Sequence, residues 1–252
     1  MSRIRLDQLV LDRGLAATRS QAQAMLLAGH IRVGAGDGAR SDRKPGEMVD
    51  PSVPLERLAT PRFVSRGGEK LAAALDAFEI TVGGCVCLDV GASTGGFTDC
   101  LLQRGASRVY ALDVGRGQLA ESLRADPRVI SLERTHARRL DPADPEAITL
   151  PEPVDLAVID VSFISVTRIL AGVVQQVVPG GMIVSLVKPQ FESEPRVVPK
   201  GVVRDPAVQA RAVDRVREAA IALSLDVRGH CASPLIGPAG NREFFLHLLV
   251  PG

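Results

Sequence analysis

Short apolar runs recur at regular intervals along residues 85–249, and the segments between them have helical or turn-forming patterns. This alternation of strands and helices is typical of an α/β fold with a mainly parallel sheet that helices cover on both faces. The last two predicted strands follow the final helix and extend the sheet. The predicted strands are residues 85–90, 108–113, 129–133, 156–161, 182–187, 226–229 and 243–249.

Three segments between the strands have the apolar spacing of helices: residues 96–104, 167–177 and 206–223. The third segment is the best marked of the three. Asp205 can cap its first turn with a side-chain oxygen, and Pro206 suits the first helical position because that position needs no amide hydrogen. We therefore expect a long helix just before the last two strands.

The first sixty residues follow a different pattern. Apolar residues lie on one face of a short helix that ends near Gly14, and a capping box at Thr18 opens a second helix that ends at Gly29. Residues 30–33 then predict a strand. We expect a small α+β domain over residues 1–60 and a second domain over 61–252. The prolines that mark the predicted linker are Pro51, Pro54 and Pro61.

Composition excludes several classes of function. The chain begins without an apolar secretory segment, and its apolar stretches are shorter than the roughly 20 residues that a membrane helix needs. Cys85 and Cys87 are spaced too closely for a zinc site, and no second pair follows. We therefore expect a cytoplasmic protein that binds neither a membrane nor a metal.

The candidate chemistry begins at residues 89–98, DVGASTGGFT, which follow one predicted strand and open the next helix. Glycines let the backbone turn sharply and approach a ligand, and a helix N-terminus favours an anionic group. Ser93 interrupts the glycine spacing of a dinucleotide fingerprint. Asp113 ends the following strand, where an acidic side chain can bind ribose hydroxyls. The pattern predicts a nucleoside-containing cofactor.

Six segments resemble, in the same order, the TlyA (hemolysin A) family of FtsJ-like RNA methyltransferases. They are SRGGEKL at 65–71, DVGASTGGFTDCLLQ at 89–103, DVGRGQL at 113–119, VIDVSFIS at 158–165, KPQFE at 188–192 and GVVRD at 201–205. The resemblance implies an S-adenosylmethionine cofactor, or its product S-adenosylhomocysteine as the bound form. It also implies 2′-O-methylation of ribosomal RNA cytidines, so that ribosomal RNA or a ribosomal subunit is the expected partner.

For the fold, the resemblance implies a small S-four-like RNA-binding domain followed by a Rossmann-like methyltransferase domain. His136 stands where the family typically has an asparagine near the adenine. Taken together, the motif and the resemblance assign the cofactor contacts to Asp89, Gly91, Ser93, Thr94, Gly95, Gly96, Phe97, Asp113, His136 and Asp160.

The resemblance further implies a catalytic tetrad of Lys70, Asp160, Lys188 and Glu243. Two of these positions have independent support, because Asp160 and Lys188 end predicted strands, where ligands of parallel sheets bind. A lysine can accept a hydroxyl proton when its neutral form is accessible. Our hypothesis is that Lys188 activates the acceptor hydroxyl and Asp160 orients this lysine, while Lys70 and Glu243 position the acceptor.

Charge and one altered segment leave two alternatives open. Residues 1–62 carry a net charge of +3 and the remainder −2, whereas an RNA-binding enzyme usually has a clear basic surface. Residues 193–200, SEPRVVPK, replace the glycine-rich, lysine-bearing loop typical of the family. One alternative is an enzyme of secondary metabolism that acts on a small molecule such as a polyketide, with or without methyl transfer. The other is a noncatalytic RNA-binding assembly factor.

Overall fold

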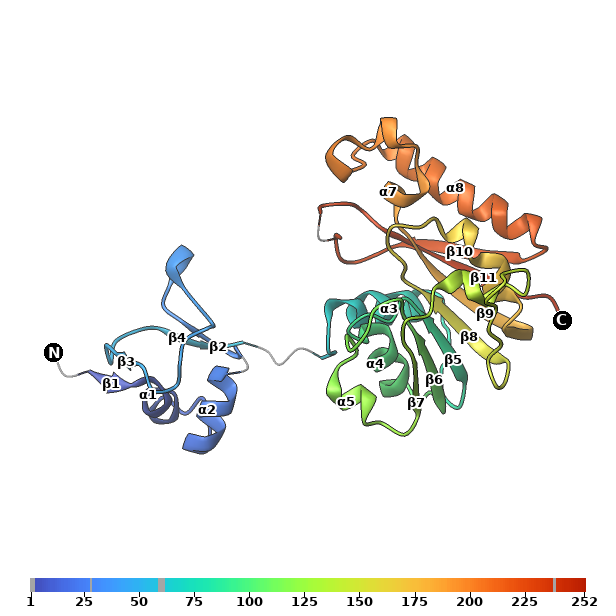
Figure 1. Ribbon diagram of the computed structural model, residues 1–252. Coiled ribbons are helices and arrows are strands. Elements are labelled where there is room, and N and C mark those ends of the chain that lie inside the picture. Colours follow the sequence, from blue (N-terminus) through green and yellow to red (C-terminus); the bar gives the residue numbers. More distant parts are fainter. Residues whose placement is uncertain (1–2, 28, 59–61, 238) are drawn as a thin grey trace. The chain divides into compact units, whose positions relative to one another are not determined.

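The computed structural model describes residues 3–27, 29–58, 62–237 and 239–252. The chain divides into two compact units, Met1–Pro61 and Arg62–Gly252 (Figure 1). The predicted domain boundary, with Pro61, lies outside the described residues. None of the helices in the described ranges combines the length and apolar character that a bilayer crossing requires.

The N-terminal unit pairs two helices with two small antiparallel sheets, in which β1 pairs with β3 and β2 pairs with β4. Its elements are β1 (Ile4–Arg5), α1 (Leu6–Asp12), α2 (Arg19–Leu27), β2 (Ile31–Val33), the 3-10 turn η1 (Gly36–Gly38), β3 (Met48–Val49) and β4 (Leu55–Arg57). Both helices and β2 agree with the sequence prediction. The prediction that Pro51 and Pro54 belong to a linker is wrong, because β4 follows them and pairs with β2 inside this unit.

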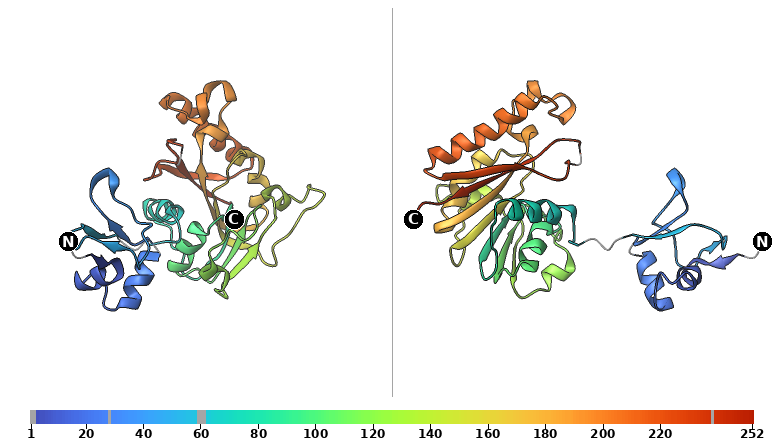
Figure 2. Two further views of the ribbon diagram at one scale, coloured as in Figure 1. Left: turned by 60° about the vertical axis from the view of Figure 1, so that its left-hand side comes forward. Right: turned by 180° about the vertical axis from the view of Figure 1, so that it is seen from behind.

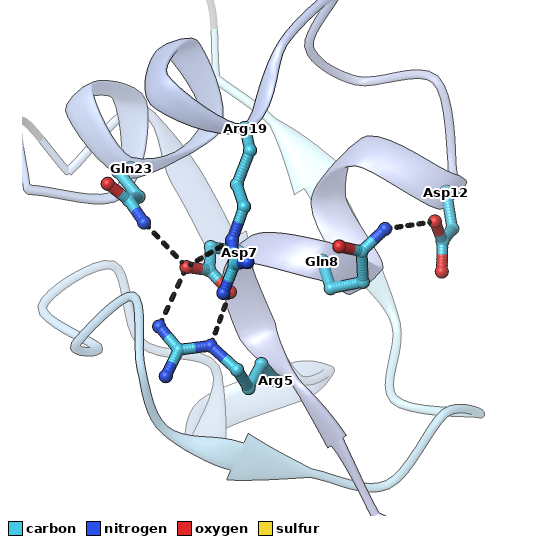
Figure 3. A network of polar contacts seen from close by, with 6 residues as sticks. All are labelled: Arg5, Asp7, Gln8, Asp12, Arg19 and Gln23. Atoms are coloured by element: carbon cyan, nitrogen blue, oxygen red, sulfur yellow. Dashed lines mark hydrogen bonds and ion pairs between the residues drawn. The ribbon is translucent and has the colours of Figure 1, made fainter.

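A buried carboxylate ties the first strand to both helices of this unit. The Asp7 side chain on α1 is 0% exposed, and it accepts hydrogen bonds from Arg5 Nε at 3.1 Å, Arg19 Nε at 3.2 Å and Gln23 Nε2 at 2.8 Å (Figure 3). The Arg5 guanidinium, together with these other donors, holds the pKa of the Asp7 carboxyl far below its usual value. The ionised form of Asp7 therefore stabilises the fold.

The second unit is built on a seven-stranded sheet in the order β10-β11-β9-β8-β5-β6-β7. Its strands are β5 (Val86–Val90), β6 (Arg108–Leu112), β7 (Val129–Leu132), β8 (Val154–Ile159), β9 (Val177–Val187), β10 (Asp226–Ala232) and β11 (Phe244–Leu249). Strands β5 to β9 pair in parallel, whereas β11 is antiparallel to both of its neighbours. The predicted Rossmann-like fold with a mainly parallel sheet is confirmed.

Helices cover both faces of this sheet (Figure 2). The helices and 3-10 turns are α3 (Arg66–Ala77), α4 (Gly96–Gln103), α5 (Glu121–Arg124), η2 (Ala137–Leu140), η3 (Val166–Arg168), α6 (Leu170–Val174), α7 (Pro189–Glu192), η4 (Pro195–Val197), η5 (Pro199–Gly201) and α8 (Pro206–Ala222). Side chains of α3 and α4 pack with those strand residues that point to one face, such as Cys87. Side chains of α6 and α8 pack with residues of the other face, such as Leu88.

The predicted helices differ from the structure in two places. The helix predicted over 167–177 is broken into η3 and α6, and Val177 already belongs to β9, where it pairs with Val154. A run of valines suits a buried strand as well as a helix, and sheet pairing decides between them here. Helix α3 was not predicted, because glycines occupy two positions of its first turn. The predicted helix at 206–223 is confirmed as α8, and Asp205 accepts a hydrogen bond from the Ala207 amide.

Replacing Asp7 with asparagine should destabilise the N-terminal unit. The variant loses charge-assisted hydrogen bonds that join α1 to β1 and α2, and we expect a loss of about 1–3 kcal/mol. Because the folded-state pKa of Asp7 lies below the unfolded-state value, this contribution is complete above the unfolded pKa and is lost as the pH falls toward the folded pKa. Hydrogen exchange of residues 4–27 in the full chain measures both effects.

Asp12→Asn is the matched control, because Asp12 ends the same helix and accepts an exposed hydrogen bond from Gln8 (Figure 3). It removes the same charge without uncovering a buried network. Equal exchange rates in the Asp7 and Asp12 variants would contradict the stabilising role of the Asp7 network.

Candidate functional site

The site lies where the strand order of the large sheet reverses. From β5 the chain runs outward to β6 and β7, then returns to β8 on the other side of β5. A crevice forms at the carboxyl ends of two such strands. Gly91 follows β5 with a φ of 91°, and a Cβ there would stand 2.4 Å from the carbonyl oxygen of Asp160, which follows β8. Glycine is therefore required for the two strand ends to approach this closely.

A cavity of about 230 Å³ opens at this crevice, between the N-termini of α3 and α4. The two helix ends are in close contact, because a Cβ on Gly96 would lie 2.2 Å from Ser65 Oγ. Converging helix N-termini favour an anionic group such as a carboxylate. The cavity is lined by Ser65, Arg66, Gly67, Lys70, Gly91, Ala92, Ser93, Thr94, Gly96, Phe97 and Asp160.

Four of the predicted cofactor contacts lie outside this lining: Asp89, Gly95, Asp113 and His136. Asp89 is fully buried, and its Oδ2 accepts a hydrogen bond from Thr98 Oγ1 at 2.7 Å. Asp89 Oδ1 has no hydrogen-bond partner among the described residues, and burial raises the pKa of this carboxyl to about 7. Gly95 begins α4 with a φ of 95°, and a Cβ there would collide with Leu123. Asp89 and Gly95 therefore stabilise the conformation of the glycine-rich loop and do not line the cavity.

Asp113 shapes the same loop from the neighbouring strand. Its Oδ2 accepts the Ser93 amide at 2.8 Å, and its Oδ1 accepts the Gly115 amide at 2.6 Å. Asp113 and Ser93 also line a small cavity of about 10 Å³ beside β6. His136 lines neither cavity; its Nδ1 accepts the Arg138 amide at 3.1 Å and caps η2.

The four residues of the predicted tetrad form two ion pairs. Lys70 Nζ on α3 lies 2.5 Å from Glu243 Oε2, and both side chains are buried. Lys188 Nζ lies 2.6 Å from Asp160 Oδ1 and donates a hydrogen bond to Ser162 Oγ at 2.9 Å. One member of each pair, Lys70 and Asp160, lines the same cavity. The structure thus brings the predicted residues together from four distant segments of the chain.

Three notable residues near the site were not predicted. Ser162 fixes Lys188, as described above. Phe163 follows Ser162 with a φ of 66°; its side chain is 92% exposed, and its ring centroid lies 5.3 Å from that of Phe191. Arg66 lines the cavity from the start of α3. The positions of Arg66 and Phe163 within family-like segments were the available signal, since periodicity says nothing of exposed residues.

The neighbouring loops are held by buried polar groups. Asn241 Oδ1 accepts the Val203 amide at 2.8 Å, and Asn241 Nδ2 donates to the Gly201 carbonyl at 2.9 Å. Asn241 therefore anchors the segment before α8. Within the described ranges, no group of three or more histidine, cysteine, aspartate or glutamate side chains is placed to hold a metal ion.

Comparison with known proteins agrees with this geometry. Residues 63–249 match the family model described as FtsJ-like methyltransferase, and residues 4–34 match the one described as S4 domain. A Mycobacterium tuberculosis protein named 16S/23S rRNA (cytidine-2′-O)-methyltransferase TlyA is 49% identical over 249 residues, which cover 98% of this chain and 90% of that protein. Hemolysin A of Brachyspira hyodysenteriae is 38% identical over 98% of this chain and 100% of its own length.

A solved structure of a Streptococcus thermophilus protein has 41% sequence identity and a TM-score of 0.73, and the match covers 100% of this chain and 90% of that one. The N-methyltransferase NodS of Bradyrhizobium japonicum matches at 14% identity with a TM-score of 0.51, over 74% of this chain and 97% of its own, which indicates a shared fold. The family resemblance found in the sequence is confirmed.

The buried Asp89 predicts an unusual dependence of stability on pH. Its pKa is raised from 3.8 to about 7, so the folded protein keeps a proton that the unfolded chain releases. This group therefore makes the folded state less stable as the pH rises through that window. Asp89→Asn should gain stability relative to the wild type over the window, by up to about 4 kcal/mol, at about 1.4 kcal/mol per pKa unit.

Thr98→Val serves as the opposite test, because the hydrogen bond from Thr98 favours ionised Asp89. The folded-state pKa of Asp89 rises further in this variant, so its loss of stability should continue to a higher pH than in the wild type. Denaturant unfolding at a series of pH values measures all three proteins. Parallel curves for the wild type and Asp89→Asn would contradict the burial of a titrating carboxyl.

Proposed function

The chain belongs to the FtsJ-like methyltransferase family, and we propose that it transfers a methyl group from S-adenosylmethionine to the ribose 2′-hydroxyl of a cytidine in ribosomal RNA. The main support for this proposal is the pair of lysine–carboxylate contacts at one crevice, Lys70–Glu243 and Lys188–Asp160. The name of the Mycobacterium tuberculosis relative supports the acceptor. Such an acceptor implies a cytoplasmic protein.

The groups around the cavity suit S-adenosylmethionine or S-adenosylhomocysteine. The close approach of Gly91 to Asp160 leaves a bare backbone surface, and the N-termini of α3 and α4 would hold the carboxylate of the amino acid part. The buried Asp89 Oδ1 leaves an acceptor without a partner beneath the same loop. When bound, the cofactor supplies an electrophilic methyl group on a sulfonium.

The nucleoside part would bind beside Asp113. A carboxylate offers about four lone-pair directions, so the amides of Ser93 and Gly115 leave capacity for ribose hydroxyls. Ser93, Thr94, Gly96 and Phe97 would complete the wall. We assign Asp89 and Gly95 a supporting role under the loop, and His136 the capping of η2 beside it.

Lys188 is the residue that we assign to activation of the 2′-hydroxyl. An alcohol becomes a competent nucleophile when a neighbouring base accepts its proton. In its neutral form Lys188 would accept that proton at Nζ, while Asp160 and Ser162 fix the position of this atom. Asp160 also stabilises the lysine once it carries the proton.

The second ion pair positions the acceptor. Glu243 is buried and holds Lys70 Nζ at the cavity wall, where this ammonium group can donate to an oxygen of the incoming ribose. The exposed Phe163 follows β8 at the same end of the sheet and offers a ring face to a nucleobase. Single-stranded RNA is recognised largely by such stacking, which favours a nucleotide acceptor over the small-molecule alternative.

We infer that the two units are separate domains with separate roles in RNA binding and methyl transfer. The N-terminal unit carries the S4 match and the excess of basic residues, so we assign it to RNA docking through backbone phosphates. The unit Arg62–Gly252 carries out the transfer.

The function is tested with methyl-labelled S-adenosylmethionine and unmodified ribosomal subunits. We expect label in ribosomal RNA, recovered as 2′-O-methylcytidine after nuclease digestion. Cofactor binding without RNA binding or labelling would contradict the proposal and favour the small-molecule alternative. RNA binding without any transfer would favour a noncatalytic assembly factor.

Replacing Gly91 with alanine should weaken cofactor binding. The new Cβ collides with the Asp160 carbonyl, and the backbone must shift at the floor of the cavity. We expect the dissociation constant for S-adenosylmethionine, measured by calorimetry, to rise by a factor of about 10 or more, since each such factor corresponds to about 1.4 kcal/mol. Gly84→Ala is the control, because Gly84 has a similar φ of 81° with open space around it. Equal affinities in the two variants would rule out the close approach as the cause.

Lys188→Met should lower kcat by a factor of about 100 or more, as expected for loss of a general base. Cofactor affinity should stay within about threefold of the wild type, a difference of less than 1 kcal/mol. Lys200→Met removes the same charge from an exposed position and should keep full activity. Methyl transfer at saturating cofactor measures the rates, and an active Lys188→Met enzyme would disprove the assigned role.

A further inference from the structure

A second cavity, of about 250 Å³, lies between α8 and the segment that follows α7. From α8 it is lined by Val208, Arg211, Ala212 and Arg215, whose spacing of three and four places them on one face of the helix. Residues 192–197 line the other side. This side includes the first half of the segment 193–200, which departs from the family pattern and has no role in the site described above.

Three arginines and two glutamates line this cavity. Arg196 is neutralised locally by an ion pair with Glu194 at 2.6 Å. Neither Arg211 nor Arg215 forms an ion pair with any residue in the described ranges. Arg211 and Arg215 thus border an apolar floor outside any ion pair, with the carboxyl of Glu192 near Arg215.

The remaining carboxylate of this cavity is already engaged. Glu192 is buried, and its two side-chain oxygens accept hydrogen bonds from Ser165 Oγ at 2.5 Å and from the Val166 amide at 2.7 Å. Its main-chain carbonyl accepts a hydrogen bond from Arg215 Nη1 at 3.1 Å, which fixes that guanidinium at the cavity. Glu192 therefore joins the arginine face of α8 to the loop that follows Asp160.

We propose that Arg211 and Arg215 form a subsite for a backbone phosphate of the acceptor RNA. A guanidinium group presents a planar fork of donors that matches phosphate oxygens. Lys188 is the N-cap residue of α7, and α7 ends at Glu192, which lines this cavity. This short helix therefore connects the proposed base to the proposed phosphate subsite. The subsite rests on the proposed function, because it takes its ligand from the same RNA.

The test compares Arg211→Gln/Arg215→Gln with Arg217→Gln in the full chain. Arg217 lies on the same helix but lines a different cavity with His230, so its substitution removes one positive charge from elsewhere on α8. Binding to ribosomal subunits is measured over a range of salt concentrations, and methyl transfer is followed in parallel. Circular dichroism confirms that each variant is folded.

The double variant should bind subunits with a salt dependence reduced by about 0.7–0.9 in the slope of log K against log salt, the value for the loss of one phosphate contact. Its KM for subunits should rise at least about tenfold, with kcat and cofactor affinity unchanged. The Arg217 variant should keep a slope that differs from the wild type by less than about 0.5, below one phosphate contact.

An unchanged slope in the double variant, with an active wild type, overturns the subsite and leaves the proposed function standing. Thermal stabilisation of the wild type alone by millimolar inorganic phosphate, with an unchanged slope, overturns the RNA assignment in favour of a free phosphate. A wild type that neither binds nor methylates subunits overturns both proposals.

Discussion

The carbonyl of Asp160 and the Cα of Gly91 approach so closely that no side chain fits between them. This contact joins the ends of β5 and β8, the two strands at which the sheet order reverses, and the remaining geometry of the site depends on it. It places the glycine-rich loop over one side of the crevice and the Asp160 carboxylate on the other. A wider separation would leave the proposed base and the cofactor cavity without a common wall.

Charge inside this crevice is arranged so that each buried group has a partner. Burying an ion costs several kcal/mol unless a counter-ion and hydrogen bonds compensate. Lys70 and Glu243 compensate each other, and Lys188 has both Asp160 and Ser162. Such pairs contribute little net stability compared with apolar packing, so their presence at a cavity points to function. Asp89 has no counter-ion among the described residues; its hydrogen bond from Thr98 does not offset the cost of burial, and the pKa of its carboxyl is raised.

Local pattern was enough to predict the large sheet, because five of its seven strands carry a buried apolar run, and the partly exposed β7 and β10 still lie between turn signals. It was not enough for α3, whose Gly67 and Gly68 are typical of a loop. Gly68 is instead needed for close packing, because a Cβ there would lie 2.2 Å from the Phe63 side chain. The contact between Lys70 and Glu243 spans 173 residues, and no local pattern encodes it. Only the family resemblance placed those two residues in one group. The motif likewise could not distinguish residues that line the cavity from buried residues, such as Asp89, that stabilise the loop.

Asp160 and Lys188 are proposed to act as one unit where the strand order reverses, and a double-mutant cycle separates this from independent roles. The kcat for methyl transfer to ribosomal subunits is measured at saturating cofactor for Lys188→Met, Asp160→Asn and the double variant. If the two residues act together, the double variant should be about as slow as the slower single variant, as is found for residues that form one catalytic unit. If the two decreases in kcat multiply in the double variant, the residues act independently, which would contradict their action as one unit.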